Sequence, residues 1–535
     1  MDRRSEAAIS NDLPNRGRSM STWTGIDITQ IHLTTSDLLR GAAKSARDKV
    51  YLVHVQRNSE ETFGQFEAKV NRISNLMAAR YGVKKGDKVC TMSENIPELL
   101  HTIMAITNLG AVWVPINSML VGESLRYIIE ASDSRFVCAS DRYRATVSAV
   151  LDKVKAPVEL LPINELAERA ESMPATFESP ARPDDDSMII FTSGTTGFPK
   201  GVLHTHNTYI RTAVRGLEVL ETDSSHRIHV YLPFFHGWAY LLMLGALYHR
   251  CTMIMEDRFH AETYWETIEK FRITQDHWTG TVPINLMKMP KTDFESRVRL
   301  KILGTFGALY QTMKERWPNL TFQSLFGQTE HPFITAVPPD QIFPGSDGVP
   351  KYPDEVLIVD DEGRPLPPGQ VGEIVCRCRC GVRMKGYYKN EEATAKTIRG
   401  DDLYTGDLGQ LDERGHLHFV GRKKDAFRVR GEMVSAEHVE HLITGHPKVA
   451  ECAIVGYRPP EKEALKEDEI IAHLVLKPGE SLSAEEFSSW SEANLPRFMR
   501  PRYLRIRESL PKTATERIQR FKIREEGLVG CTKLF

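Results

Sequence analysis

The sequence predicts an α/β protein: two doubly wound α/β subdomains, a small β-rich subdomain, and a small C-terminal α+β unit. Three observations support this prediction. Helix-like and strand-like patterns alternate through the first third of the 535 residues and again from about residue 205 to 335. From Val356 onward, short strands separated by turns replace this alternation. After Gly421 the chain becomes charged and then resumes as a compact mixture of helices and strands.

The first alternation starts with a helix that we expect Ser36 to cap and that runs through Ala43. We expect helices over 66–81 and 97–109 and from Glu123, and strands over 51–55, 111–115 and 135–138. Residues 172–186, rich in Pro and Asp, predict a connector. The apolar stretch 232–255 contains histidines and an arginine, which predicts a buried helix and strand rather than a membrane span.

Composition excludes several functional classes. Hydrophobic residues make up 41% and charged residues 26% of the chain, which is typical of a soluble globular protein. The net charge of −2 argues against a broad nucleic-acid or membrane-binding surface. No apolar core follows the charged start, so we expect no secretion signal, and we expect residues 1–30 to be a disordered tail. Eight cysteines without such a signal predict a reducing, cytoplasmic location.

Three of these cysteines, Cys376, Cys378 and Cys380, alternate with arginines. In a strand this spacing places all three thiols on one face. A metal site would need further ligands from elsewhere in the chain, and no second cluster is near in the sequence. We therefore interpret the three as core residues.

The stretch Phe191-Thr-Ser-Gly-Thr-Thr-Gly-Phe-Pro-Lys-Gly-Val202 is the strongest functional signal. It follows a buried strand-like run, and its glycines allow backbone N–H groups to approach a ligand closely. Hydroxyl groups add donors and Lys200 adds a positive charge, a combination suited to a triphosphate. The alternative is a surface turn rich in Gly, Ser and Thr. A preceding strand and a Pro-Lys-Gly ending make the phosphate loop the better interpretation.

Two further segments fit nucleotide chemistry. Phe326-Gly-Gln-Thr-Glu330 offers a ring that can stack on a base, a hydroxyl for a phosphate, and a carboxylate for a hard divalent cation. Tyr404-Thr-Gly-Asp407 places a carboxylate after a tight turn, where it can accept hydrogen bonds from ribose hydroxyls. Taken singly, Phe326 could be a core residue, Glu330 a helix-start charge and Asp407 a turn residue.

With these motifs in order, the chain resembles the adenylate-forming superfamily of acyl-CoA synthetases, luciferases and peptide-synthetase adenylation domains. The resemblance covers about residues 35–527 and includes Leu232-Pro-Phe-Phe-His236, Gly372-Glu-Ile374, Gly421-Arg-Lys-Lys-Asp425 and Leu510-Pro-Lys-Thr513. The C-terminal half is similar to carnitine/crotonobetaine-CoA ligases through residues 430–435 and 485–507. The resemblance implies two half-reactions. A carboxylate attacks the α-phosphate of ATP to give acyl-AMP and pyrophosphate, and the thiol of coenzyme A then displaces AMP.

The resemblance also implies roles for individual residues. The β- and γ-phosphates would be bound by Thr192, Ser193, Gly194, Thr195, Thr196, Gly197 and Lys200. Adenine would lie against Gly307 and Ala308 and stack on Phe326. Thr329 would touch the α-phosphate and Glu330 would hold Mg²⁺, with Gly327 and Gln328 also among the cofactor-binding residues. Asp407 would hold the ribose with Arg422 close by, and His236, beside Trp238, would be the gate between the acyl pocket and the pantetheine tunnel.

By the same resemblance, residues 31–422 form a large N-terminal domain and residues 423–535 a small mobile domain that hinges near Lys424. This domain would move between an adenylating and a thioester-forming pose, so that one cleft serves both reactions. Arg428, Arg430 and Gly431 would face the coenzyme A tunnel.

Two departures from the family pattern stand out. The last motif normally ends in Gly-Lys, whereas Glu516 and Arg517 occupy that place here. Arg517 keeps the positive charge, but its planar fork does not substitute freely for an ammonium group. In addition, Phe306 and Leu325 stand where relatives commonly have glycine, so the acyl pocket that they line should be small.

We therefore expect an ATP-dependent acid–CoA ligase that uses ATP, Mg²⁺ and coenzyme A on a short or medium compact acid, in a setting such as fatty acid metabolism. One alternative is transfer of the acyl group to a carrier protein or another acceptor. Another is a nucleotide- or acyl-binding pseudoenzyme, because of Arg517. Expected partners include neither nucleic acid nor membrane, and the oligomeric state stays open, with a homodimer as one form.

Overall fold

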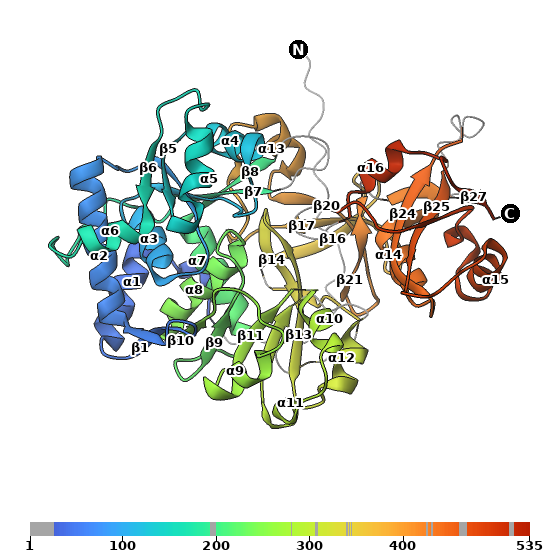
Figure 1. Ribbon diagram of the computed structural model, residues 1–535, viewed down its shortest axis with the longest axis horizontal. Coiled ribbons are helices and arrows are strands. Elements are labelled where there is room, and N and C mark those ends of the chain that lie inside the picture. Colours follow the sequence, from blue (N-terminus) through green and yellow to red (C-terminus); the bar gives the residue numbers. More distant parts are fainter. Residues whose placement is uncertain are drawn as a thin grey trace, which may run out of the picture.

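The computed structural model describes residues 26–192, 199–279, 281–304, 309–338, 341, 343, 345–351, 353–423, 426–429, 432–459, 468–512 and 518–534. They form a large N-terminal domain and a smaller C-terminal domain, which lies at the right in Figure 1. The expected tail extends too far, because residues 28–30 form a short 3₁₀ helix. Asp27 caps this turn through the N–H of Thr29, and Ile28 is buried in the main core.

The first α/β subdomain contains a mostly parallel sheet that ends in an antiparallel hairpin. Its strand order among the described residues is β18-β8-β7-β4-β3-β5-β6. The bounds are β3 (Lys88–Met92), β4 (Val112–Pro115), β5 (Ser134–Ala139), β6 (Glu159–Pro162), β7 (Asp186–Thr192), β8 (Lys200–Thr205) and β18 (Gly386–Tyr387). β7 runs parallel to β4, whereas β8 and β18 are antiparallel additions. The two strands that flank the predicted phosphate loop, β7 and β8, therefore pair at this end of the sheet.

The second subdomain contains the sheet β15-β14-β13-β12-β11-β9-β10-β1-β2, counted over the described residues. The bounds are β1 (Val50–His54), β2 (Ser59–Thr62), β9 (Arg227–Val230), β10 (Thr252–Met255), β11 (Gln275–Trp278), β12 (Lys301–Gly304), β13 (Thr321–Gln328), β14 (His331–Ala336) and β15 (Val349–Pro350). The N-terminal strand β1 runs parallel to β10, with Leu52 opposite Met253. The second sheet is thus completed by a hairpin from the start of the chain.

The two sheets share a layer of helices. The main hydrophobic core runs through α1 (Thr35–Ala46), α2 (Phe63–Tyr81), α3 (Pro97–Asn108), α7 (His206–Glu218) and α8 (Gly237–His249), and it includes strand residues of both sheets. The opposite face of the first sheet is covered by α4 (Gly122–Ala131) and α5 (Asp141–Leu151). The remaining helices of the two subdomains are α6 (Ile163–Arg169), α9 (Tyr264–Lys270), α10 (Thr281–Lys288), α11 (Asp293–Arg297) and α12 (Tyr310–Arg316).

A β-rich subdomain follows, as the sequence predicts. Its described strands are β16 (Glu355–Val359), β17 (Gly372–Arg377), β19 (Ile398–Arg399), β20 (Asp402–Leu411) and β21 (Leu417–Arg422), with the helix α13 (Glu391–Thr397) between β18 and β19. The C-terminal domain contains the ribbon β22 (Ala426–Val429) and β23 (Glu432–Ser435), the sheet β24 (Val449–Tyr457), β25 (Glu469–Leu476), β26 (Tyr503–Arg507) and β27 (Thr532–Lys533), and the helices α14 (Ala436–Thr444), α15 (Ala484–Asn494) and α16 (Arg520–Glu525).

Most predicted elements of the first subdomain form at their expected places, and the differences lie at helix starts. Ser36 does not cap α1, because Thr34 does so in a capping box with Asp37, and Ser36 lies within the first turn. The helix expected from residue 66 begins at Phe63, where Thr62 and Gln65 form a second capping box. The stretch 232–255 forms α8 and β10, as predicted. Among the described helices, none has the length and apolar character needed to cross a lipid bilayer.

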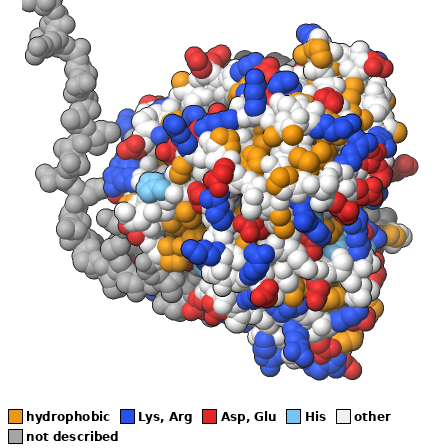
Figure 2. All heavy atoms as spheres, turned by 90° about the vertical axis from the view of Figure 1, so that its left-hand side faces the viewer, with side chains coloured by type: hydrophobic (Ala, Val, Ile, Leu, Met, Phe, Trp, Pro, Cys, Tyr) orange, Lys and Arg blue, Asp and Glu red, His pale blue; other side chains and the backbone are white. Residues whose placement is uncertain are grey.

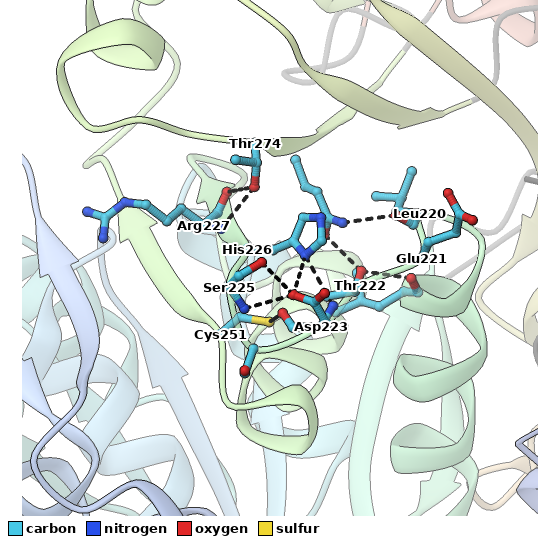
Figure 3. A network of polar contacts seen from close by, with 12 residues as sticks. Leu220, Glu221, Thr222, Asp223, Ser225, His226, Arg227, Cys251 and Thr274 are labelled. Atoms are coloured by element: carbon cyan, nitrogen blue, oxygen red, sulfur yellow. Dashed lines mark hydrogen bonds and ion pairs between the residues drawn. The ribbon is translucent and has the colours of Figure 1, made fainter.

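A polar network fixes the turn that leads from α7 into β9 (Figure 3). One oxygen of Asp223 accepts a hydrogen bond from the Ser225 N–H at 2.8 Å and lies 3.0 Å from His226 Nδ1. Hydrogen bonds from Ser225 and His226 lower the pKa of Asp223 to about 2. The Cys251 thiol, next to β10, donates to the Asp223 carbonyl at 3.1 Å. This turn therefore fixes the C-terminal end of α7 against the second sheet.

The distribution of charged side chains on the surface is consistent with the net charge of −2. On the face shown in Figure 2, positive and negative side chains are interspersed and hydrophobic side chains gather mainly above the centre. A charge distribution of this kind gives little long-range attraction for a polyanion.

A buried ion pair crosses the second sheet and predicts a pH-dependent stability. His229 on β9 lies between Asp276, at 3.3 Å from Nδ1, and Glu256, at 2.9 Å from Nε2. Burial alone would lower the pKa of His229, but the two carboxylates outweigh it and raise the pKa to about 9. Because the folded-state pKa exceeds the unfolded value of about 6.5, this pair stabilises the fold fully below about pH 6.5, and its contribution is lost as the pH rises through about 9.

We therefore expect the free energy of unfolding to fall by about 1–3 kcal/mol across that window. Urea unfolding of the wild type and of His229→Asn, each measured below and above the window, tests this. The difference between the two proteins should be larger on the acid side. A constant difference would mean that His229 is not charged in the folded protein.

Candidate active site

The predicted phosphate-loop segment, residues 191–202, begins on β7 and ends on β8, and these two strands pair with each other. Thr192 pairs with Lys200 across the hairpin, and both are half-buried. The Thr192 hydroxyl lies 3.5 Å from the Lys200 carbonyl. The predicted phosphate-binding residues between them, Ser193, Gly194, Thr195, Thr196 and Gly197, lie outside the described residues.

Lys200 and Glu330 meet at one tyrosine. The Lys200 ammonium lies 4.3 Å from the centre of the Tyr387 ring, a cation–π contact. The Tyr387 hydroxyl donates a 2.7 Å hydrogen bond to Glu330 Oε1. Tyr387 reaches this place because β18 pairs with β8, with Tyr387 opposite Val202. The phosphate-loop lysine and the predicted metal-binding carboxylate, 130 positions apart in the sequence, are thus held together.

The segment 326–330 forms the end of β13 and the tight turn into β14. A side chain at Gly327 would run into the backbone carbonyl of Pro332, so the close approach of the two strands needs glycine here. The Thr329 carbonyl accepts a 2.8 Å hydrogen bond from Nε2 of the buried His204 on β8. Burial lowers the pKa of His204 to about 4, so this imidazole is neutral near neutral pH. His204 therefore ties the turn that presents Thr329 and Glu330 to the phosphate-loop hairpin.

His204 is expected to be a positioning residue. Replacing it with leucine should lower kcat/KM for ATP about tenfold, because a buried hydrogen bond contributes about 0.5–1.5 kcal/mol and the Thr329 carbonyl loses its partner. His204→Gln keeps a hydrogen-bond donor and should therefore retain part of the wild-type kcat/KM. The control is His206→Leu, since His206 is equally buried but contacts Thr35. The His206→Leu variant should lower the unfolding temperature and leave kcat/KM for ATP unchanged. Equal effects of the two leucine variants on kcat/KM would contradict the assignment.

Phe326 and Leu325 are both buried, with exposed fractions of 5% and 6%. The Phe326 ring stacks on Phe419 of β21, with ring centres 5.6 Å apart and an angle of 30° between the planes. Leu325 points into the main core and pairs with Ala336 across β13 and β14. Phe326 thus joins the turn that bears Glu330 to the strand that ends in Arg422.

Asp407 and Arg422 face each other across β20 and β21. Arg422 Nε lies 3.0 Å from Asp407 Oδ1, and the Asp407 carboxylate is 1% exposed. Gly406 before it has a φ of +68°, the left-handed conformation that glycine adopts freely. Glu373 of the Gly-Glu-Ile motif accepts hydrogen bonds from the Gly406 N–H at 3.1 Å and from Lys423 Nζ at 2.9 Å. One carboxylate thus supports the Asp407 turn and anchors the residue before the predicted hinge.

His236 and Trp238 lie at the start of α8. His236 is exposed and directly precedes the helix, and its role as a gate stays a prediction. Trp238 is half-buried and stacks on His277, with ring centres 4.2 Å apart.

The remaining predicted site residues lie outside the described residues. They are Phe306, Gly307, Ala308, Lys424, Arg430, Gly431 and Arg517, and the side chain of Arg428 is likewise not described. Their assigned roles stay predictions.

Sequence reasoning missed Tyr387 and His204. Tyr387 follows a glycine in Gly386-Tyr-Tyr388, a pattern without chemical meaning by itself. His204 lies in a plain strand pattern directly after the phosphate loop. Both act through pairings between segments far apart in the chain, which the local pattern does not reveal.

Comparison with known proteins identifies the family. A family profile described as AMP-binding enzyme matches residues 39–388, and a profile for the AMP-binding enzyme C-terminal domain matches residues 438–517. A crotonobetaine/carnitine–CoA ligase of Escherichia coli O45:K1 is 30% identical over 478 residues, covering 85% of this chain and 91% of the relative. The enzyme of the same name from Shigella sonnei is 29% identical over 478 residues with the same coverage.

Solved structures share the fold. The anthranilate CoA ligase AuaEII, in complex with anthranoyl-AMP, superposes with a TM-score of 0.82 at 25% identity and covers 94% of this chain and 99% of its own. The o-succinylbenzoate coenzyme A synthetase of Bacillus subtilis, in complex with ATP and a magnesium ion, superposes at 0.81 with 24% identity over 92% and 100% of the two chains. The protein is thus an AMP-forming acid–thiol ligase that joins a carboxylic acid to coenzyme A through an acyl-AMP. The chain belongs to the AMP-binding enzyme family, in the acyl-CoA ligase branch of the adenylate-forming superfamily.

Proposed function

We propose that this ligase activates a compact carboxylic acid of short or medium length at the site where Lys200, Tyr387 and Glu330 meet. The observation that supports the placement is the contact of both charged residues with Tyr387, at 4.3 Å for the Lys200 ammonium and 2.7 Å for Glu330 Oε1. A cation and an anion held on one aromatic side chain, beside a glycine-rich hairpin loop, suit a triphosphate and its divalent cation.

In this proposal Lys200 binds the phosphates that leave as pyrophosphate, and Glu330 binds Mg²⁺. The carboxylate oxygens of Glu330 are the ligand type that Mg²⁺ prefers, and the hydrogen bond from Tyr387 orients them. When bound, the ion would neutralise charge on the phosphate oxygens. Asp407 accepts hydrogen bonds from the ribose, with Arg422 at its side.

We further propose that the C-terminal domain takes part in both half-reactions, in two different poses. It pivots near Lys424, while the salt bridge of Lys423 with Glu373 fixes the chain just before the pivot. Arg517 then assists attack on the α-phosphate in one pose. Residues 428–431 face coenzyme A in the other.

We infer the size of the acid from the pocket wall that the family resemblance assigns to Phe306 and Leu325. Leu325 is 6% exposed, and Phe306 stands at the other position where relatives commonly have glycine. Burying one more methylene group stabilises the complex by about 0.8 kcal/mol, whereas forcing it into filled space costs about 1–3 kcal/mol. The steric cost is larger, so activity should fall as the acid grows. The curated relatives are named for crotonobetaine and carnitine, which are both compact.

The test is pyrophosphate release with acids graded in length and charge, with and without coenzyme A. We expect release with small acids and AMP formation that depends on coenzyme A. A preference for long-chain acids would contradict the pocket assignment. Pyrophosphate release that coenzyme A does not affect would favour a carrier protein as the acceptor. If no acid gave pyrophosphate release, a protein that binds its ligands but cannot adenylate, because arginine stands at position 517, would be favoured.

A further inference from the structure

A second cluster of reactive side chains lies outside the nucleotide site. His331 begins β14, Cys376 lies near the end of β17, and Cys378 follows two residues later. All three are buried, with exposed fractions of 0%, 0% and 7%. A ring nitrogen of His331 and the two sulfur atoms all lie within 4.8 Å of one another. From the sequence we interpreted these cysteines as core residues because no further metal ligand was near them in the chain. The structure supplies that ligand, His331, from the other sheet.

The spacing of the two sulfur atoms fits a metal site. They are 3.6 Å apart. Zinc–sulfur bonds of about 2.3 Å at a tetrahedral angle place two sulfur atoms about 3.8 Å apart, whereas a disulfide would bring them to about 2.05 Å. Two thiols in ordinary contact have a similar spacing, so the feature that distinguishes a metal site from a thiol pair is the histidine.

His331 is a buried imidazole that lacks hydrogen-bond partners among the described residues. The carboxylate of Asp354 lies 3.7 Å from Nε2, which is beyond hydrogen-bond distance. Burying a polar group without a partner costs free energy, so such a side chain is uncommon unless a ligand binds it. A metal would occupy one nitrogen, and Asp354 stands where a carboxylate commonly accepts a hydrogen bond from the other nitrogen of a metal-bound histidine.

Charge also permits a dication at this place. Two thiolates, formed as each cysteine releases its proton to solvent, would neutralise Zn²⁺. The buried Arg215 of α7 is already paired with Asp354, at 2.7 Å from its Nη1. The whole cluster with the ion therefore has no net charge, which is the condition for burying it. Cys380, whose thiol donates a 2.8 Å hydrogen bond to Asp354, is the nearby group that can complete a fourfold site; passing its proton to Asp354 would keep the cluster neutral.

We propose that His331, Cys376 and Cys378 bind a structural zinc ion that joins β14 of the second sheet to β17 of the β-rich subdomain. This site adjoins the nucleotide site, because His331 directly follows Glu330. The ion would fix the start of β14 and thereby the turn that presents Glu330. The proposal is independent of the identity of the acid.

The test uses the full chain, purified under reducing conditions from cells grown with added zinc. Elemental analysis should find one zinc ion per chain. Replacement by Co²⁺ should give a sulfur-to-cobalt charge-transfer band. The variant Cys376→Ser/Cys378→Ser should lose both, while the matched control Cys138→Ser, a buried thiol on β5, should retain both.

Further variants address the case in which the double variant fails to fold. His331→Cys keeps the number of ligands, so it should retain the metal and strengthen the cobalt band through a third thiolate. Chelator treatment should lower the unfolding temperature of the wild type and leave a metal-free His331→Gln unchanged. Reduced wild type that takes up neither zinc nor cobalt would overturn the proposal, as would an unchanged cobalt spectrum in His331→Cys.

Discussion

Glu330→Gln is expected to lower kcat for acyl-AMP formation by about 10²–10³-fold, the usual loss when one electrostatic contact to a transition state is removed. The amide keeps the size of the side chain and can still accept the hydrogen bond from Tyr387. It lacks the negative charge that a hard cation requires. Because Glu330 is half-buried in a turn, the unfolding temperature should change little. Initial rates across a range of Mg²⁺ concentrations, with calorimetric unfolding alongside, measure both effects.

Tyr387→Phe provides a graded comparison. It retains the ring beneath Lys200 and removes only the hydroxyl that orients Glu330. We expect a loss of about 10–100-fold, smaller than that of Glu330→Gln, because one hydrogen bond to a charged group contributes about 1.5–3 kcal/mol and the carboxylate remains. Early unfolding of Glu330→Gln with normal specific activity would show that Glu330 is structural and that the metal assignment is wrong.

Asp407→Asn should raise the KM for ATP by about 10–100-fold. The expected cause is the loss of a charged acceptor for the ribose hydroxyls, an interaction of about 1.5–3 kcal/mol. The change also weakens the contact with Arg422, which lies 3.0 Å from Oδ1. The KM for ATP and the affinity for AMP, measured by calorimetry, should shift together.

Asp402→Asn is the matched control. Asp402 lies on the same strand and binds Arg377 at 2.8 Å, so the same chemical change is made away from the predicted ribose site. It should leave the KM for ATP unchanged. Equal shifts in the two variants would assign Asp407 to the stability of the β-rich subdomain rather than to the nucleotide.

The fold class could be predicted because local patterns repeat. Pro97 starts α3 as expected, and the switch to short strands after Val356 marks the β-rich subdomain. The predicted helix starts were less accurate, because several neighbouring hydroxyl residues can each cap the same helix. Thr34 caps α1 instead of Ser36, since Asp37 lies three residues after Thr34 and completes a capping box.

The motifs of the site could be predicted from the sequence, but the contacts between residues of different motifs could not. Lys200 and Glu330 each belong to a motif with chemical meaning, but their joint contact with Tyr387 depends on a strand pairing across the sheet edge. The cysteine cluster illustrates the same limit. The spacing of Cys376 and Cys378 suggested a shared face, while His331, the residue that gives the cluster a metal-binding geometry, comes from a different sheet. Contacts of this kind depend on tertiary structure.

The position of β1 has a consequence for folding during synthesis. Its parallel partner β10 is translated about 200 residues later. Until β10 emerges from the ribosome, the β1–β2 hairpin has an unpaired edge, and such edges favour pairing with other chains. Non-local parallel pairing also forms slowly, because a long loop must close first. The β1–β2 hairpin should therefore need protection by a chaperone until residue 255 has emerged from the ribosome, and fragments that end before β10 should aggregate.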